Sequence, residues 1–213
     1  FCLMFMNIHF IYLVQIMIFN YNSNLDINLI SKLVKLKKYK ILDFGCGIGS
    51  WSNKNIRSNR IQSIILYDKN KNLIKILKKK YKQKKIKINF NFKKILKKKD
   101  YNLIIMSSVA QYMTFYNLRK LLMKIVFKKN VFVIITDIPK YFRLIEFFLL
   151  PIFNINRFIF SLKMIGNSKY KKLKYISHSR KDFLSLDDKF KVCFSKNIND
   201  LNFLRYSVIL KLK

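Results

Sequence analysis

The chain has 213 residues, of which 44 are Lys or Arg and 10 are Asp or Glu, so its net charge is +34. With 51% hydrophobic and 15% aromatic residues it can build a core, which excludes an intrinsically disordered chain. Three widely spaced cysteines and two histidines exclude a disulfide framework and a zinc cluster, and they predict no metal site. A reducing, cytoplasmic setting is the default expectation.

The positive charge is spread along the chain, with dense lysine runs at 78–87 and 93–99. Residue types with A/T-rich codons are enriched, whereas Gly, Pro, Ala and Arg are rare. Codon drift therefore explains much of the charge, and the runs are interpreted as solvated faces of a helix and of loops. Binding to nucleic acid is an alternative that the sequence does not favour.

The first 23 residues form a separate apolar segment, which starts at Phe1 rather than at Met. Residues 1–19 have about the length of a membrane span. Three interpretations stay open: an amphipathic helix that covers the domain, a membrane anchor, or translated sequence upstream of the true start. Membrane association is therefore an expectation beside the cytoplasmic one.

From residue 24 onward, short apolar runs alternate with helical patterns. In chain order we expect a helix from Asn24 to about Lys37, a strand at Tyr39–Phe44, a short helix around Trp51–Arg57, a strand at Ile61–Tyr67, a helix capped by Asn70, a strand from Ile86 to Phe92, a strand at Tyr101–Met106, a helix around Leu118–Val126 and a strand at Val131–Thr136.

The pattern changes after Pro139, where a bulky apolar stretch, Tyr141–Phe160, begins. It predicts a helical insertion at about 140–178, followed by a helix at Lys181–Leu186 and strands at Phe190–Phe194 and Tyr206–Leu212. The alternation predicts an α/β fold of the Rossmann-like, doubly wound type. We expect one domain over residues 24–213, with a mostly parallel seven-stranded sheet and an antiparallel C-terminal strand.

Three of the four glycines, Gly45, Gly47 and Gly49, fall within five residues after the first strand. A tight strand-to-helix turn needs the backbone freedom of Gly, and the following helix offers free N–H groups to an anionic ligand. Asp43 precedes the turn, and Asp68 ends the second strand 19 residues after Gly49. Two scarce acids thus flank a ligand-binding turn.

The run Ile41-Leu42-Asp43-Phe44-Gly45-Cys46-Gly47-Ile48-Gly49 resembles the first motif of class I S-adenosylmethionine-dependent methyltransferases. Tyr101–Tyr112 resembles the fourth-strand region of the same family. The resemblance covers roughly residues 25–136. Asn91 and Asn102 depart from it, since many members have acids there.

The resemblance implies S-adenosyl-L-methionine as the cofactor and a role for each matching residue. The glycines would hold the amino-acid end of the cofactor, Asp68 the ribose, Asn91 the adenine edge and Ser107 the wall near the methyl group. Asp43 would support the loop, and Cys46 would be a small filler within it.

The acceptor half is less determined. Tyr112, Asp137 and His178 are the candidate catalytic residues, each with a structural alternative: packing for Tyr112, a cap or turn for Asp137 and simple exposure for His178. The apolar insertion suggests a small or lipid-linked acceptor. The alternatives are an RNA or protein methyltransferase that uses the basic surface, and a degenerate domain without activity. The oligomeric state is not predicted.

Overall fold

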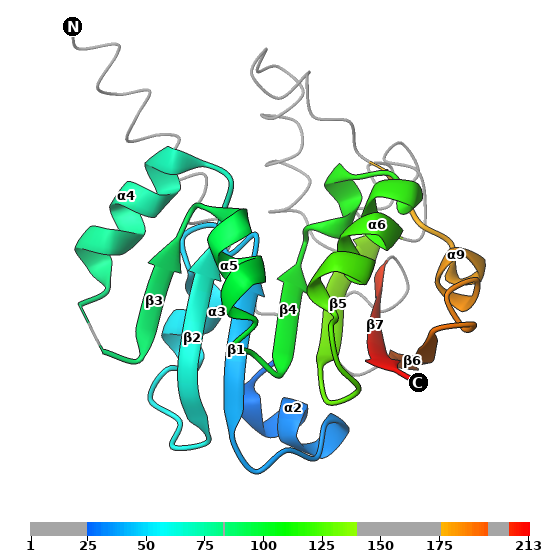
Figure 1. Ribbon diagram of the computed structural model, residues 1–213, viewed down its shortest axis with the longest axis horizontal. Coiled ribbons are helices and arrows are strands. Elements are labelled where there is room, and N and C mark those ends of the chain that lie inside the picture. The colour runs from blue at the N-terminus through cyan, green and yellow to red at the C-terminus, as the bar shows by residue number, and fades with distance from the viewer. Residues whose placement is uncertain (1–24, 83, 140–175, 196–204) are drawn as a thin grey trace, which may run out of the picture.

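The computed structural model describes residues 25–82, 84–139, 176–195 and 205–213. Its centre is a seven-stranded sheet with the strand order β3-β2-β1-β4-β5-β7-β6 (Figure 1). Neighbours among β1 to β5 pair in parallel, and β7 pairs antiparallel with both β5 and β6. The expected mostly parallel sheet with one antiparallel C-terminal strand is confirmed, and that strand lies between β5 and β6.

The elements alternate along the chain as expected. The strands are β1 (Tyr39–Phe44), β2 (Ile61–Tyr67), β3 (Ile86–Asn89), β4 (Leu103–Ser107), β5 (Phe132–Pro139), β6 (Phe190–Ser195) and β7 (Arg205–Leu212). The helices are α2 (Ile27–Leu33), α3 (Ser50–Asn55), α4 (Lys71–Lys80), α5 (Phe92–Lys98), α6 (Phe115–Ile125) and α9 (Arg180–Leu184), with a short 3-10 helix, η1, at Ala110–Tyr112.

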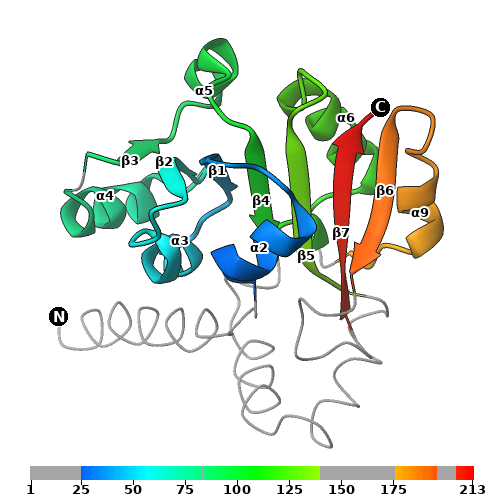
Figure 2. The same ribbon diagram turned by 90° about the horizontal axis from the view of Figure 1, so that it is seen from below.

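Helices cover both faces of the sheet because its central strands are apolar on both sides. One core cluster joins the sheet to α5, α6 and α9 through buried Ile95, Leu118 and Phe183. The other core cluster joins the sheet to α2, α3 and α4 through Ile30 and Trp51, among others. Figure 2 shows α5 and α6 on one side of the sheet and α2 and α3 on the other.

Several boundaries differ from the sequence-based expectation, and three of the differences are explained by local structure. The first helix begins at Ile27, because the Asp26 side chain caps it by accepting from Leu29 N. The third strand ends at Asn89 rather than Phe92, because Asn91 caps a helix that the alternation of Phe90 and Phe92 concealed. The fifth strand was expected to end at Thr136, but it continues through Asp137 to Pro139, with a register shift between Ile135 and Ile138.

Two expected segments lie outside the described residues: the N-terminal stretch 1–23 and nearly all of the insertion 140–178. Among the residues that are described, no helix has the length and apolarity to cross a membrane. Within the same residues, no group of three or more His, Cys, Asp or Glu side chains is arranged to hold a metal ion.

Candidate active site

The turn after β1 has the left-handed backbone that its glycines predicted. Gly45, Gly47 and Gly49 have φ of 72°, 56° and 73°. The N–H groups of Gly45 and Cys46 both donate to the Tyr67 carbonyl oxygen, at 2.8 and 3.0 Å, which fastens the turn to the end of β2. A Cβ on Gly45 would lie 2.6 Å from Val109 Cγ2, so this position also excludes a side chain by contact.

Asp68 connects the glycine turn after β1 to the segment that follows β2. Its Oδ2 accepts a hydrogen bond from Gly47 N at 3.0 Å, and its Oδ1 accepts one from Asn70 N at 2.8 Å. The side chain is half-buried and therefore reaches solvent. Each carboxylate oxygen has a second lone pair, so Asp68 can accept further hydrogen bonds from a ligand.

Asp43 lies beneath the turn and is buried, with 3% exposure. Ser52 Oγ donates to its Oδ2 at 2.7 Å from the first turn of α3. Burial raises the pKa of Asp43 to about 7, the Ser52 hydrogen bond opposes this shift, and the negative charge of Asp68 adds to it. The two acids that flank the turn therefore lie close enough to interact.

Cys46 lies in the same turn, where its surroundings disfavour the thiolate. Burial raises its pKa, and the carboxylates of Asp43 and Asp68 raise it further. A protonated thiol is a poor nucleophile, and the role of Cys46 as a small filler stays a prediction.

The strand register aligns the remaining expected cofactor residues with this turn. Asp43 pairs with Ile105 across β1 and β4, so Ser107 is level with Gly45. Ser107 is half-buried and accepts a hydrogen bond from Thr136 Oγ1 at 3.1 Å. Asn91 follows β3 at the same edge of the sheet, where it caps α5 by accepting from Lys94 N at 3.3 Å.

A group of three aromatic rings borders Asp68 and was missed by the sequence analysis. The Phe44 and Tyr67 centroids lie 4.8 Å apart, and Phe92 lies 5.6 and 5.4 Å from them. Tyr67 and Phe92 are only partly buried. Together they offer an apolar surface at the carboxyl ends of β1 and β2.

A second polar group lies at the carboxyl ends of β4 and β5. Ser108 and Asp137 both have left-handed backbones, with φ of 56° and 62°, and the Ser108 hydroxyl donates to Asp137 Oδ2. Arg205 Nη1 lies 2.9 Å from the same oxygen and also donates to Gln111 Oε1 at 3.1 Å. Within the described part of the chain, Asp137 Oδ1 is buried and accepts no hydrogen bond. Strain and an unpaired buried oxygen are features that cluster at functional sites.

The other two catalytic candidates lie beside this group. The Tyr112 side chain, at the end of η1, is 48% exposed. His178 is 2% exposed, so the alternative of simple exposure is wrong. Its Nε2 lies 2.9 Å from the Ala110 carbonyl oxygen, and its ring packs against Phe115 and Phe183. These contacts make His178 part of the packing.

Several site residues gave little signal in the sequence. The contact of Ser52 with Asp43 was not predicted, because serine is common at helix starts. Ser52 follows Gly49 by three residues, and there its hydroxyl faces Asp43. Tyr81, whose hydroxyl donates to Gly49 O at 2.8 Å, lies 32 residues further along the chain. Arg205 offered one signal: it is one of only seven arginines and it opens an apolar strand.

The sequence of this turn also matches a known family. The model of the methyltransferase small domain matches residues 22–107, which include the glycine turn, both flanking acids and β4. Residues 22–107 thus belong to this methyltransferase family, in agreement with the resemblance to class I S-adenosylmethionine-dependent methyltransferases. No curated protein matches the sequence of this methyltransferase.

Solved structures share the fold of the methyltransferase. The methyltransferase domain of bacterial CtHen1 is 17% identical, with a TM-score of 0.57 over 87% of this chain and 95% of that one. An S-adenosylmethionine-dependent methyltransferase from Anabaena variabilis is 14% identical, with a TM-score of 0.58 over 88% and 84%. The magnesium protoporphyrin IX methyltransferase of Synechocystis, solved with bound S-adenosylhomocysteine, is 16% identical, with a TM-score of 0.51 over 85% and 76%.

Proposed function

We propose that this methyltransferase binds S-adenosylmethionine across the glycine turn and methylates a small acceptor, free or lipid-linked, at the carboxyl ends of β4 and β5. The observation that carries the proposal is the Asp68 carboxylate, which bridges Gly47 N and Asn70 N. It keeps a lone pair on each oxygen for the two ribose hydroxyls. Both hydroxyls can therefore bind without opening the turn.

The other residues of the turn fit the rest of the cofactor. The backbone at Gly45, Gly47 and Gly49 would hold its amino-acid end, as open α/β sheets hold ligands beyond their carboxyl ends. The Asp43 carboxyl would stabilise the positive amino group, and the approach of that charge would favour its ionised form.

The adenine would lie against the exposed sides of Tyr67 and Phe92, where apolar aromatic surface is available. The Asn91 amide nitrogen would donate to its edge. Ser107, level with Gly45, would form the wall near the transferred group.

The bound cofactor supplies a methyl group that is already activated as a sulfonium. The protein therefore needs mainly to position the acceptor and exclude water. An acceptor with an O–H or N–H group must also lose a proton. Asp137 fits this task, because Arg205 and Ser108 hold its Oδ2 and leave Oδ1 to accept.

Titration calorimetry with S-adenosylmethionine and S-adenosylhomocysteine tests the cofactor half. We expect binding by the natural chain and a loss of at least about tenfold in affinity for Asp68→Ala, since two charge-assisted hydrogen bonds disappear. Asp100→Ala removes an acid of the same type from the amino end of β4, away from the glycine turn, and should leave the affinity for the cofactor unchanged. Equal affinity for Asp68→Ala and the natural chain would contradict the assigned pocket.

The acceptor class is tested by incubating the enzyme and methyl-labelled cofactor with a cell extract, then separating small molecules and lipids, RNA, and protein. The proposal predicts label in the small-molecule or lipid fraction. Label in RNA or protein would establish the opposing acceptor class. Cofactor binding with no label in any fraction would point to a degenerate domain.

A further inference from the structure

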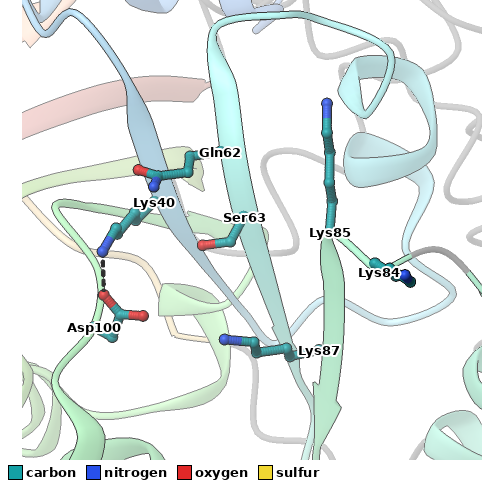
Figure 3. Close-up of a pocket in the computed structure, with 7 residues that line it drawn as sticks. All are labelled: Lys40, Gln62, Ser63, Lys84, Lys85, Lys87 and Asp100. Atoms are coloured by element: carbon teal, nitrogen blue, oxygen red, sulfur yellow. Dashed lines mark hydrogen bonds and ion pairs between the residues drawn. The ribbon is translucent and has the colours of Figure 1, made fainter.

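The amino ends of β1, β2 and β3 form a further polar region, at the opposite ends of the strands from the glycine turn. It is a hollow of about 280 Å³, which we name the lysine hollow. Its lining consists of four lysines, Lys40, Lys84, Lys85 and Lys87, together with Gln62, Ser63 and Asp100 (Figure 3).

The register explains why these side chains gather. Lys40 pairs with Ser63 across β1 and β2, and Ile64 pairs with Ile86 across β2 and β3. Lys85 therefore continues the row that Lys40 and Ser63 begin, and Lys87, two residues later, points to the same face. These polar residues thus lie on one face of the sheet, at its amino end, whereas helices cover other parts of the sheet.

That face is open at its amino end because α5 is short. With seven residues, α5 is about 10 Å long, whereas a strand such as β1 with six residues extends about 20 Å. Figure 1 shows α5 over the upper part of β1 and β2, away from their amino ends. The hollow is therefore a product of the architecture and not only of a lysine-rich composition.

The charge in the hollow is strongly unbalanced. Four ammonium groups line it, and Asp100 is the only acid among its described lining residues. Asp100 already pairs with Lys40, at 2.7 Å between Nζ and Oδ1. Lys84, Lys85 and Lys87 are exposed, and Figure 3 shows the Lys87 ammonium directed into the space beside Ser63 and Asp100. The positive surroundings also lower the pKa of Asp100, first through its hydrogen bond with Lys40.

We propose that the lysine hollow binds the phosphodiester backbone of a nucleic acid. Lys85 and Lys87 are two residues apart along β3, about 7 Å, and Lys40 on β1 lies two strands, about 10 Å, from Lys85, so the ammonium groups can contact more than one backbone phosphate. None of the described lining side chains is apolar, so the hollow has nothing to insert into a lipid bilayer and no ring on which a base could stack. Recognition would therefore be electrostatic and independent of base sequence.

Fluorescence anisotropy with a labelled oligouridylate tests this proposal. The triple variant Lys84→Gln/Lys85→Gln/Lys87→Gln should bind at least about tenfold more weakly at physiological salt. The slope of log affinity against log salt should become shallower by about 0.7 for each phosphate that the variant no longer neutralises. The matched control is Lys181→Gln/Lys189→Gln/Lys191→Gln, which removes the same charge from exposed positions in α9 and at β6. This control should change affinity less than about threefold. Asp100→Asn should tighten binding, because it removes the acid that opposes a phosphate.

Equal weakening by both triple variants would overturn the proposal, because it would show that only total charge matters. Absence of binding by the natural chain at physiological salt would overturn it as well. A third contrary result would be stronger dependence on these lysines for phosphatidylserine vesicles than for the oligonucleotide. The readout does not depend on methyl transfer, and the hollow variant should bind S-adenosylhomocysteine normally, so failure here and failure of the proposed function are distinct.

Discussion

Arg205 and Asp137 form a buried ion pair, with 2.9 Å between Nη1 and Oδ2 and side chains that are 4% and 8% exposed. Such a pair adds little net stability when intact, because both charges lose their water. Breaking it leaves one charge buried and uncompensated. The pair lies beside two left-handed residues, Ser108 and Asp137, and this combination of strain and buried charge supports the proposed role of Asp137.

Arg205→Met should lower the free energy of unfolding by about 3–5 kcal/mol, measured by urea denaturation, because the Asp137 carboxylate stays buried without its partner. The double variant Arg205→Met/Asp137→Asn should recover part of this loss, since no buried charge remains. Lys40→Met breaks the exposed pair with Asp100 and serves as control, with an expected cost of about 0–1 kcal/mol. Equal costs for the two single variants would contradict this interpretation.

Gly45→Ala should destabilise the fold by about 2–4 kcal/mol, because it combines a left-handed backbone with a Cβ placed 2.6 Å from Val109 Cγ2. Adding Val109→Ala removes the steric clash but not the backbone penalty, so it should restore only part of the stability. Thermal denaturation of the single and double variants measures both contributions. Full recovery in the double variant would show that the φ of Gly45 carries no cost.

The stability of the chain should depend on pH through Asp43. Its folded pKa of about 7 exceeds the ordinary value of 3.8, so the folded state keeps a proton that the unfolded chain releases. The resulting stabilisation is complete below pH 3.8 and is lost as the pH rises toward 7. Between about pH 5 and pH 8, the free energy of unfolding should fall by about 2.5 kcal/mol more in the natural chain than in Asp43→Asn.

Urea unfolding of both chains across this range gives the difference directly. Subtracting the Asp43→Asn curve removes the contributions of all other titrating groups. Parallel curves for the two chains would mean that Asp43 is ionised throughout the range.

Cys46 should resist alkylation. Burial and the carboxylates of Asp43 and Asp68 raise the pKa of its thiol, whereas Cys193 is exposed on β6. At about pH 8, iodoacetamide should label Cys193 at least about ten times faster than Cys46. Peptide mapping by mass spectrometry measures the two rates in one sample. Faster labelling of Cys46 would show an open turn with an accessible thiolate.

The sequence alone predicted most of the fold, because each central strand is a short apolar run followed by a turn residue. β2 was predicted to the residue at Ile61–Tyr67. The differences at the starts of α2 and α5 have a common cause: local patterns do not reveal side-chain caps. Asn91 begins α5 where the alternation of Ile86, Ile88 and Phe90 suggested a continuing strand.

The geometry of the glycine turn was easier to predict than that of the group around Asp137, because glycines and acids are rare in this chain and therefore informative where they occur. The acceptor side depends on contacts between residues far apart in sequence, such as the 94 residues between Gln111 and Arg205. No local pattern encodes such a pairing. Asp137 was a candidate by position, but the hydrogen bonds of its Oδ2 and the unpaired Oδ1 needed three-dimensional coordinates.

The most direct measurement of the central claim is a crystal structure of the chain grown with S-adenosylhomocysteine. We predict the ribose hydroxyls within hydrogen-bonding distance of the Asp68 carboxylate, with the Gly47 and Asn70 hydrogen bonds retained, and the amino-acid end over the turn at Gly45–Gly49. A ligand bound elsewhere, or a turn region that the nucleoside does not enter, would contradict the account.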